Sequence, residues 1–557
     1  MIRKKIRLGE LLINEGILTQ EQLNKALEEQ KRLKSITQYK KLGELLVDLG
    51  FVDEKTILQL LSKQLEIDFI DLYAQKIDYD LLTSFPISML EENLVLPFRM
   101  DENLIYVATA DPLNYDIIDT IKRLVNKDAK IYLAFSRDIL AVIENVKRYQ
   151  KAKELIKKIK NDLNETVTLT SRAIDDFVDF ILKDSIKKRC TDVHIEPQKY
   201  NFLIRGRIDG VLNELFSFND DIYAPLVSKI KLLSNMDISE KRKPQDGRFT
   251  KDYDNKSYDF RVSTAPVLHG ESVVLRILDQ QKILLKMNEL GMSEYNLKRL
   301  EFLIKSPYGI VFVTGPTGSG KTTTLYAALN EVKGPEKKII TIEDPIEYEL
   351  SLVQQIPVNY KIGLTFAGVI KNILRQDPDI IMIGEIRDTD TLSSAIQASL
   401  TGHLVLGTLH TNDSISTITR LIQMGAEAYM VSDSMLGAVA QRLIRKICPH
   451  CKIEYHPKKE ELELLKDYLP EGITFYKGAG CKYCNFTGYY GREMISEILI
   501  VNSEISKLIN EGKDRETILQ EAKKTGFITM IEDAMNKLKA GITTVEEILR
   551  VVKVDNI

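Results

Sequence analysis

The sharpest change in the hydrophobic pattern lies in the middle of the chain. Ile310–Val313 are four consecutive apolar residues, which is typical of a short buried strand. Further on, Leu325, Ala328 and Leu329 recur at the spacing of one helix face. The intervening stretch Gly315–Thr322 has the pattern G-x-x-x-x-G-K-T. The order strand, glycine loop, helix predicts a phosphate-binding loop and disfavours a glycine-rich structural turn.

Such a loop binds a nucleoside triphosphate by geometry and charge. Its glycines let several backbone N–H groups point at one place, where the helix N-terminus adds positive potential. Lys321 then reaches the outer phosphates, and the Thr322 hydroxyl ligates magnesium. The residues predicted to contact ATP are Gly315, Pro316, Thr317, Gly318, Ser319, Gly320, Lys321, Thr322 and Thr323.

Two further apolar runs end in acidic residues. Ile339–Ile342 precedes Glu343, and Ile380–Ile383 precedes Gly384 and Glu385. Acids at the carboxyl ends of parallel strands lie at the sheet edge that also carries the phosphate loop. Glu385 is the first candidate to polarise the attacking water. Glu343 is the second, acting through the water shell of the metal, and the alternative for both is an exposed acid at a strand end.

Residues 401–412 predict another core strand, with His403 and His410 at its two ends. A histidine at the carboxyl end of a strand can sense a γ-phosphate, and the alternative is a satisfied structural histidine. Arg248 follows an Asp-Gly turn signal, and Arg261 lies in a strand-like run before the core. Arginines from a separate domain can act as fingers on the nucleotide; ordinary surface or ion-paired arginine is the alternative.

The N-terminus contains an internal repeat. Residues 7–30 match residues 41–64 at an offset of 34 positions. Each unit predicts two short helices. Gly16 is placed to end the first helix in a left-handed turn. Thr19 is placed to cap the second, with Gln22 completing a capping box.

The remaining pattern divides the chain into segments. Mixed α/β patterning follows the repeat to about residue 150, and the lysine-rich stretch after it predicts a helical linker with a solvated face rather than a lipid-binding patch. The predicted domains are an N-terminal module at 1–150, a linker at 151–170, an α/β domain at 171–285, the nucleotide core at 286–447, and a cysteine-bearing subdomain with a helical tail at 448–557.

Composition narrows the function classes. The 557 residues carry a net charge of −3, so no global field attracts nucleic acid. No apolar run approaches the roughly 18 residues that span a bilayer, and the basic start lacks the apolar core of a signal peptide. We therefore expect a cytoplasmic protein that is held at the inner face of the membrane through a partner.

Four of the five cysteines form two C-x-x-C pairs, Cys448 with Cys451 and Cys481 with Cys484. Two such pairs supply the four thiolates of a closed, structural zinc site, and the long stretch between them predicts an excursion of the chain. A redox pair and free thiols are the alternatives. His450 is a weaker alternative ligand, and Cys190 stands alone.

With these motifs placed, nearly the whole chain resembles the type II secretion and type IV pilus ATPase family, in its pilus assembly branch. The segments that carry the resemblance are Gly315–Thr322, Thr341–Pro345, Arg375–Asp388, Thr401–Asn412, Gln245–Arg248, Phe260–Ser263 and the four cysteines. The resemblance implies a RecA-like P-loop core after a PAS-like α/β domain, with Arg248 and Arg261 as arginine fingers. It also implies a homo-hexamer that drives a membrane platform protein and adds pilin subunits to a filament.

The repeat resembles the cyclic di-GMP module of the same family. The matching positions are Arg7, Leu8, Gly9, Leu12, Gly16 and Gln30 in the first unit, and Leu42, Gly43, Leu46, Gly50 and Gln64 in the second. Lys41 stands where the family pattern has arginine, and lysine does not stack on or fork to a guanine as arginine does. The alternative is a docking module for a membrane-anchored partner.

Three other functions stay open. The ATPase of a type II secretion system shares every catalytic motif. A scaffold that holds ATP or cyclic di-GMP without useful hydrolysis conflicts with the intact Lys321, Thr322, Glu343 and Glu385. A nucleic-acid translocase would need basic clusters with interleaved aromatics, and the sequence has none.

Overall fold

The structure is a computed structural model that describes residues 8–35, 42–49, 51–52, 54–70, 72, 75, 77–165, 172–219, 222–279, 285–469 and 472–553. By its internal contacts the chain divides into two compact units. The first comprises residues 1–180 with 480–486, and the second comprises 181–479 with 487–557.

The first unit begins with the repeat, folded as two pairs of helices. These are α1 (Leu8–Asn14), α2 (Gln20–Ser35), α3 (Leu42–Asp48) and α4 (Glu54–Leu65). Gly16 adopts a left-handed φ of 69° directly after α1, as predicted. Thr19 and Gln22 form the predicted capping box, with the Thr19 N–H donating to Gln22 Oε1 at 2.9 Å and the Gln22 N–H donating to Thr19 Oγ1 at 3.2 Å. Leu12 and Leu46, at equivalent repeat positions, are fully buried in one shared core.

The rest of the first unit is a small sheet flanked by helices. Strand β2 pairs antiparallel with β1 and parallel with β3. The helices and strands of this part of the first unit are α5 (Tyr79–Thr83), α6 (Ile87–Glu92), β1 (Val95–Met100), β2 (Leu104–Thr109), α7 (Tyr115–Val125), β3 (Asp128–Leu133) and α8 (Ser136–Glu165). Residues 151–165 of the predicted linker form the second half of α8, so the predicted boundary at 150 falls inside a helix. Ala152 and Ile159 are fully buried, so one face of this half is packed against protein. Residues 166–170 of the predicted linker lie outside the described residues.

The second unit opens with a six-stranded antiparallel sheet in the order β6-β5-β4-β9-β8-β7. Alternating residues of these strands are buried, as in β5, because one face of the sheet is covered and the other is polar. Its elements are β4 (Cys190–Pro197), β5 (Asn201–Ile208), β6 (Val211–Asn219), α10 (Tyr223–Leu233), β7 (Gln245–Tyr253), β8 (Lys256–Val267) and β9 (Gly270–Asp279); α9 (Arg172–Lys187) precedes them along the chain.

The nucleotide core is a seven-stranded sheet in the order β12-β11-β13-β14-β10-β15-β18. Six strands are parallel, and β18 is antiparallel at one edge. Alternate residues of β10 enter two different cores, Ile310 and Phe312 on one face and Val311 and Val313 on the other. The central strands β10 and β13 contain continuous apolar runs because helices cover both faces of the sheet there.

The elements of the core up to its last parallel strand are α11 (Glu294–Ile304), β10 (Gly309–Thr314), α12 (Lys321–Val332), β11 (Ile339–Glu343), β12 (Val353–Pro357), α13 (Phe366–Ile373), β13 (Ile380–Ile383), α14 (Thr389–Leu400), β14 (Leu404–Leu409), α15 (Ser416–Gln423), α16 (Ala428–Ser434) and β15 (Met435–Ile447). Helices α11 and α12 cover one face, and α13 to α16 cover the other.

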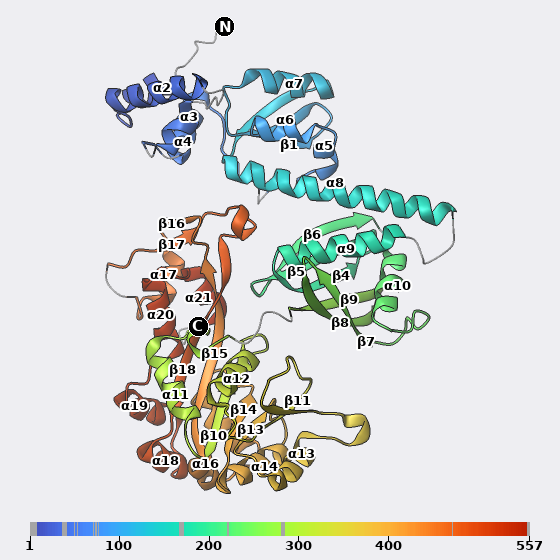
Figure 1. The fold of residues 1–557 in the computed structure, drawn as a ribbon. Helices are drawn as coiled ribbons and strands as arrows, with labels where there is room; N and C mark the ends of the chain where they lie inside the picture. Colours follow the sequence, from blue (N-terminus) through green and yellow to red (C-terminus); the bar gives the residue numbers. More distant parts are fainter. Residues whose placement is uncertain are drawn as a thin grey trace. The chain divides into compact units, whose positions relative to one another are not determined.

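The core does not end at residue 447. After the cysteine segment, β18 pairs with β15 from Gly437 to Ile447, and α18 and α19 add buried side chains to the core. Figure 1 shows β15 and β18 as a long pair with α20 and α21 beside it. The cysteine segment is therefore an insertion between β15 and β18, two neighbouring strands of the core sheet. The excursion of the chain that the cysteine spacing predicts thus starts and ends in the core, rather than following it as part of a separate subdomain. The remaining elements are β16 (Lys452–Glu454), α17 (Lys459–Leu465), β17 (Tyr476–Gly478), β18 (Tyr489–Ile500), α18 (Ser503–Asn510), α19 (Arg515–Lys524), α20 (Met530–Lys539) and α21 (Val545–Val551).

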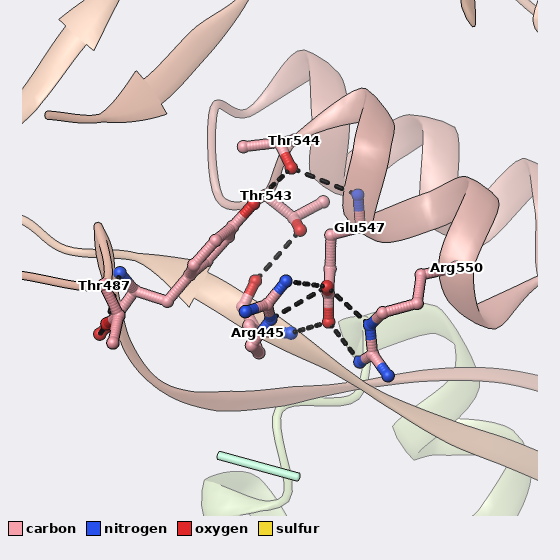
Figure 2. A network of polar contacts seen from close by, with 7 residues as sticks. Arg445, Thr487, Thr543, Thr544, Glu547 and Arg550 are labelled. Atoms are coloured by element: carbon pink, nitrogen blue, oxygen red, sulfur yellow. Dashed lines mark hydrogen bonds and ion pairs between the residues drawn. The ribbon is translucent and has the colours of Figure 1, made fainter. Parts of the chain in front are cut away.

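A buried polar network ties the last helix to β15 (Figure 2). The Glu547 side chain is fully buried and lies between two arginines. Arg445 donates to it from Nε at 2.9 Å and from its backbone N–H at 2.8 Å, and Arg550 donates from Nη2 at 2.6 Å. The Arg445 guanidinium also lies 3.9 Å from the centre of the Tyr489 ring.

Candidate active site

The phosphate loop lies between β10, which is buried throughout, and the N-terminus of α12. Gly315 has a φ of 144°, and a Cβ there would lie 2.5 Å from the backbone oxygen of Gln441, so only glycine fits. The buried Gln441 side chain, from β15, accepts from Thr324 Oγ1 at 2.9 Å and donates to the Ser319 carbonyl at 2.8 Å. Sequence analysis missed this residue, which joins the loop to its helix.

Lys321 is the first residue of α12 and folds back over the loop. Its Nζ donates to the carbonyl oxygens of Gly315 at 2.8 Å and Pro316 at 3.1 Å. Burial lowers the pKa of Lys321, and the negative charge of Glu385 offsets part of that effect. The Lys321 ammonium group is thus held at the phosphate loop, close enough to Glu385 for their charges to interact. Thr322 and Thr323 are exposed beside it, as a metal ligand and a phosphate contact require.

Glu385 lies two residues beyond β13 and is brought together with His410. His410 Nε2 lies 3.6 Å from Glu385 Oε2. Arg387 forms an ion pair with the other carboxylate oxygen. His410 directly follows β14, whose Leu409 is opposite Thr314, the last residue of β10 before the loop. The predicted acid, the predicted histidine and the phosphate loop therefore share one edge of the sheet.

Glu343 faces inward at the end of β11. Its side chain is 3% exposed and accepts hydrogen bonds from the hydroxyls of Tyr326 and Thr341 and from Gln355 Nε2 at 3.0 Å. Burial and the hydrogen bond to Glu343 raise the pKa of Tyr326. Tyr326 lies on α12, so Glu343 anchors the helix that begins at the phosphate loop. Sequence analysis missed Tyr326 because the motif itself does not include it.

His403 is not brought to the loop. It directly precedes β14, whose first residue, Leu404, is opposite Gly309 at the start of β10. The six residues of β14 separate it from the loop edge, a span on the order of 20 Å. Its Nδ1 lies 2.8 Å from the Ala398 carbonyl near the end of α14. This is the structural role that the sequence left open.

Three arginines lie directly opposite one another on neighbouring strands of the six-stranded sheet. Arg261 on β8 is paired with Arg248 on β7 and with Arg276 on β9. Like charges that face one another across strands repel, so this row favours a bound anion. Arg276, the last arginine of the row, forms an ion pair with Asp192, with Arg276 Nε 3.0 Å from Asp192 Oδ1. Sequence spacing alone did not reveal Arg276.

Arg261 makes the contact that links this sheet to the core. Its Nη1 lies 2.8 Å from Glu347 Oε2, and its Nη2 donates to the Ile346 carbonyl at 3.0 Å. Both partners follow β11 within four residues of Glu343. Arg248 is exposed. Of the two predicted arginine fingers, Arg261 therefore contacts the segment that follows Glu343.

Cys448, Cys451, Cys481 and Cys484 form a cluster in which the four Sγ atoms lie within 4.8 Å of one another. Cys481 Sγ and Cys484 Sγ are 3.7 Å apart. Tetrahedral coordination with Zn–S bonds of about 2.3 Å places sulfurs about 3.8 Å apart. The thiolate donor set and its spacing therefore fit zinc.

The repeat residues are described in part. Gly9 and Leu12 are buried on α1, and a Cβ at Gly9 would lie 2.7 Å from Leu23 Cδ1, so a larger residue there would have to displace the Leu23 side chain. Leu8, Gly43 and Leu46 lie in the same packed region, and Gln30 lies on α2. Arg7, Lys41 and Gly50 lie outside the described residues, as does the side chain of Gln64.

A family model described as type II/IV secretion system protein matches residues 168–550, and an MshEN domain model matches residues 65–153. The type IV pilus assembly ATPase PilB of Myxococcus xanthus is 38% identical over 98% of both chains. The type II secretion system protein E of Dickeya dadantii is 43% identical over 73% of this chain and 85% of its own.

The solved structure of the Yersinia pseudotuberculosis ATPase DotB is similar in fold to this chain. It has a TM-score of 0.52 at 20% identity and covers 68% of this chain and 93% of its own. Among the helices that the structure describes, none has the length and apolar character needed to cross a bilayer.

Proposed function

Because the chain belongs to the type II/IV secretion ATPase family, we propose that it hydrolyses ATP to power the assembly of type IV pili. The proposal extends to a homo-hexameric ring at the inner face of the membrane, which drives a platform protein as subunits join a filament. The similarity to PilB over 98% of both chains favours this branch, and the similarity to type II secretion proteins supports the alternative.

The observation that carries the proposed activity is the shared sheet edge of Lys321, Glu385 and His410. Lys321 grips the outer phosphates, and the Thr322 hydroxyl would hold a magnesium ion, which would supply positive charge to them. Glu385 polarises the attacking water, while Glu343 holds α12 in place and would contact the water shell of that ion. His410, beside Glu385, senses the loss of the γ-phosphate. Arg261 and Arg248 stabilise charge on the transferring phosphoryl group, and His403 takes no catalytic part.

The predicted domains become working parts in this proposal. The segment at 171–285 pivots against a RecA-like core, and the motion is passed to the platform protein. The core extends from 286 to 447 and resumes at β18, because that strand pairs with β15. The module at 1–150 receives regulatory or docking signals and is joined to the body through α8 and residues 166–171.

Zinc in the four-cysteine cluster would hold the insertion closed. We expect about one zinc per chain in the purified protein, and Cys451→Ser to lose it, because serine is a poor zinc ligand. Metal content by mass spectrometry of the intact chain checks this. Cys190→Ser is the matched control, since Cys190 lies on β4 and outside the cluster. Full zinc retention in Cys451→Ser would contradict the assignment.

Cyclic di-GMP is the proposed ligand of the N-terminal repeat, because the repeat resembles the cyclic di-GMP module of the family and its helix pairs are packed in one core. The MshEN model matches the adjacent residues 65–153. We expect Lys41→Arg to tighten binding about five- to tenfold, because a guanidinium forks to guanine and stacks on it. Isothermal titration of the full chain with cyclic di-GMP measures this. Lys34→Arg, at a position outside the repeat pattern, is the control. The absence of binding in both the wild type and Lys41→Arg would favour a docking module instead.

The choice between pilus and secretion is tested in cells. Purification of the protein from membranes should bring down a polytopic platform protein and filament subunits. A strain without the gene should lose surface filaments while its secretion of folded proteins continues. Loss of secretion with intact filaments would assign the protein to a type II secretion system. A wild-type chain that releases no phosphate from ATP would favour the non-hydrolysing scaffold.

A further inference from the structure

The ion pair between Arg261 and Glu347 occupies a side chain that the proposed mechanism needs elsewhere. The guanidinium is held on two sides, by the Glu347 carboxylate at 2.8 Å and by the Ile346 carbonyl at 3.0 Å. The two side chains are 30% and 26% exposed, so water screens their attraction only in part. In this arrangement the donors of Arg261 point at protein oxygens of the segment that follows β11.

The same segment contacts the helix of the phosphate loop. The Glu347 backbone N–H donates to the Tyr326 hydroxyl at 3.3 Å, and that hydroxyl donates to Glu343. Tyr326 lies on α12, about one turn beyond Thr322. The backbone of Glu347 is therefore held beside α12, the helix that begins at the phosphate loop. Its side chain forms the ion pair with Arg261.

A carboxylate and a terminal phosphate present similar oxygen pairs to a guanidinium, so they compete for the same fork of donors. We propose that Glu347 is a positioning residue that holds Arg261 in the nucleotide-free chain and competes with the γ-phosphate of ATP for it. This inference rests on the proposed function, because it requires Arg261 to act on the nucleotide. It adds a resting partner that sets how readily the finger is released.

The competition has a defined kinetic signature. If only a fraction of chains has Arg261 free, the apparent affinity for ATP falls by that fraction, whereas turnover at saturating ATP is unaffected. Ion pairs of this exposure contribute about 0.2–1 kcal/mol. Removing the carboxylate should therefore lower KM for ATP about two- to fivefold with kcat retained.

The test is steady-state phosphate release by the full chain with Glu347→Gln, Arg261→Ala and the double variant. We expect Glu347→Gln to lower KM by that factor. We expect Arg261→Ala to lower kcat about tenfold or more, and Glu347→Gln to have no effect on KM in the Arg261→Ala background. Glu349→Gln is the matched control, because Glu349 is an exposed acid on the same segment. It should match the wild type.

The outcomes separate the two ideas. If Arg261→Ala lowers kcat while Glu347→Gln leaves KM unchanged or lowers kcat, the resting contact is overturned and the arginine finger stands. If KM falls equally in the presence and absence of Arg261, Glu347 acts through something else and the inference is also overturned. If Arg261→Ala leaves kcat unchanged, the proposed role of Arg261 fails, and the resting contact fails with it.

Discussion

Glu385→Gln will lower ATP turnover by about 10²–10⁴-fold, the range that removal of a general base produces. Glutamine keeps the shape of glutamate but cannot take a proton from the attacking water. Lys321→Ala will also abolish turnover, because the charge that grips the outer phosphates is lost. Phosphate release at saturating ATP measures both effects, and size-exclusion chromatography checks that each variant has the same oligomeric state as the wild type.

The two variants are expected to fail differently. Glu385→Gln retains Lys321 and should still bind ATP, whereas Lys321→Ala should bind it weakly. Glu331→Gln is the matched control, since Glu331 is exposed near the far end of α12 and should leave turnover unchanged. Wild-type turnover in both Lys321→Ala and Glu385→Gln would refute the assignment of the active site.

Glu547→Ala should destabilise the C-terminal part of the core by about 3–5 kcal/mol, the cost of removing one partner from a buried ion pair. The Glu547 side chain is fully buried, and its loss leaves the donors of Arg445 without their acceptor while opening a cavity beside β15. Hydrogen exchange of the backbone amides of α21 and β15 in denaturant measures the local free energy of unfolding.

The neighbouring Glu546 provides the control. It is exposed in the first turn of the same helix, so Glu546→Ala should cost no more than about 1 kcal/mol. If Glu547→Ala leaves the exchange of α21 and β15 at its wild-type level, the network in Figure 2 does not hold the helix.

The same network predicts a dependence on pH. Burial raises the pKa of Glu547, but the hydrogen bonds from Arg550 and Arg445 outweigh it and hold that pKa below its ordinary value of 4.5. A carboxyl whose pKa is lower in the folded chain stabilises it fully above the unfolded value, and this contribution is lost as pH falls through the folded value. The difference in stability between the wild type and Glu547→Gln should therefore be largest above about pH 5 and shrink as the pH is lowered further.

Much of the active site was predictable because its signals are local. The phosphate loop depends on residues within one strand, one turn and one helix, and the buried β10 followed by Gly315 and Lys321 bears this out. The capping box of Thr19 and the left-handed Gly16 are local in the same sense. The predicted strands that end near Glu343 and Glu385 exist because predominantly apolar runs require cover on both faces.

Other features depended on contacts that no short window contains. The orientation of Glu343 is set by Tyr326, 17 residues earlier, and the loop is secured by Gln441, 122 residues after Ser319. His403 and His410 lie at opposite ends of the same strand, β14. The parallel register of β10 and β14 decided which of the two lies near the phosphate loop.

The sequence by itself determined the strand, glycine loop and helix around Lys321, the two cysteine pairs that form one cluster and the helical repeat, because each depends on residue types at fixed spacing. Only the tertiary structure decided that β18 returns to the core sheet and that Arg261 binds Glu347 across 86 positions (347 − 261). These are choices among many pairings that are sterically possible along the chain. The pairing that the folded chain adopts is the one that buries the most apolar surface and leaves the fewest charges without a partner.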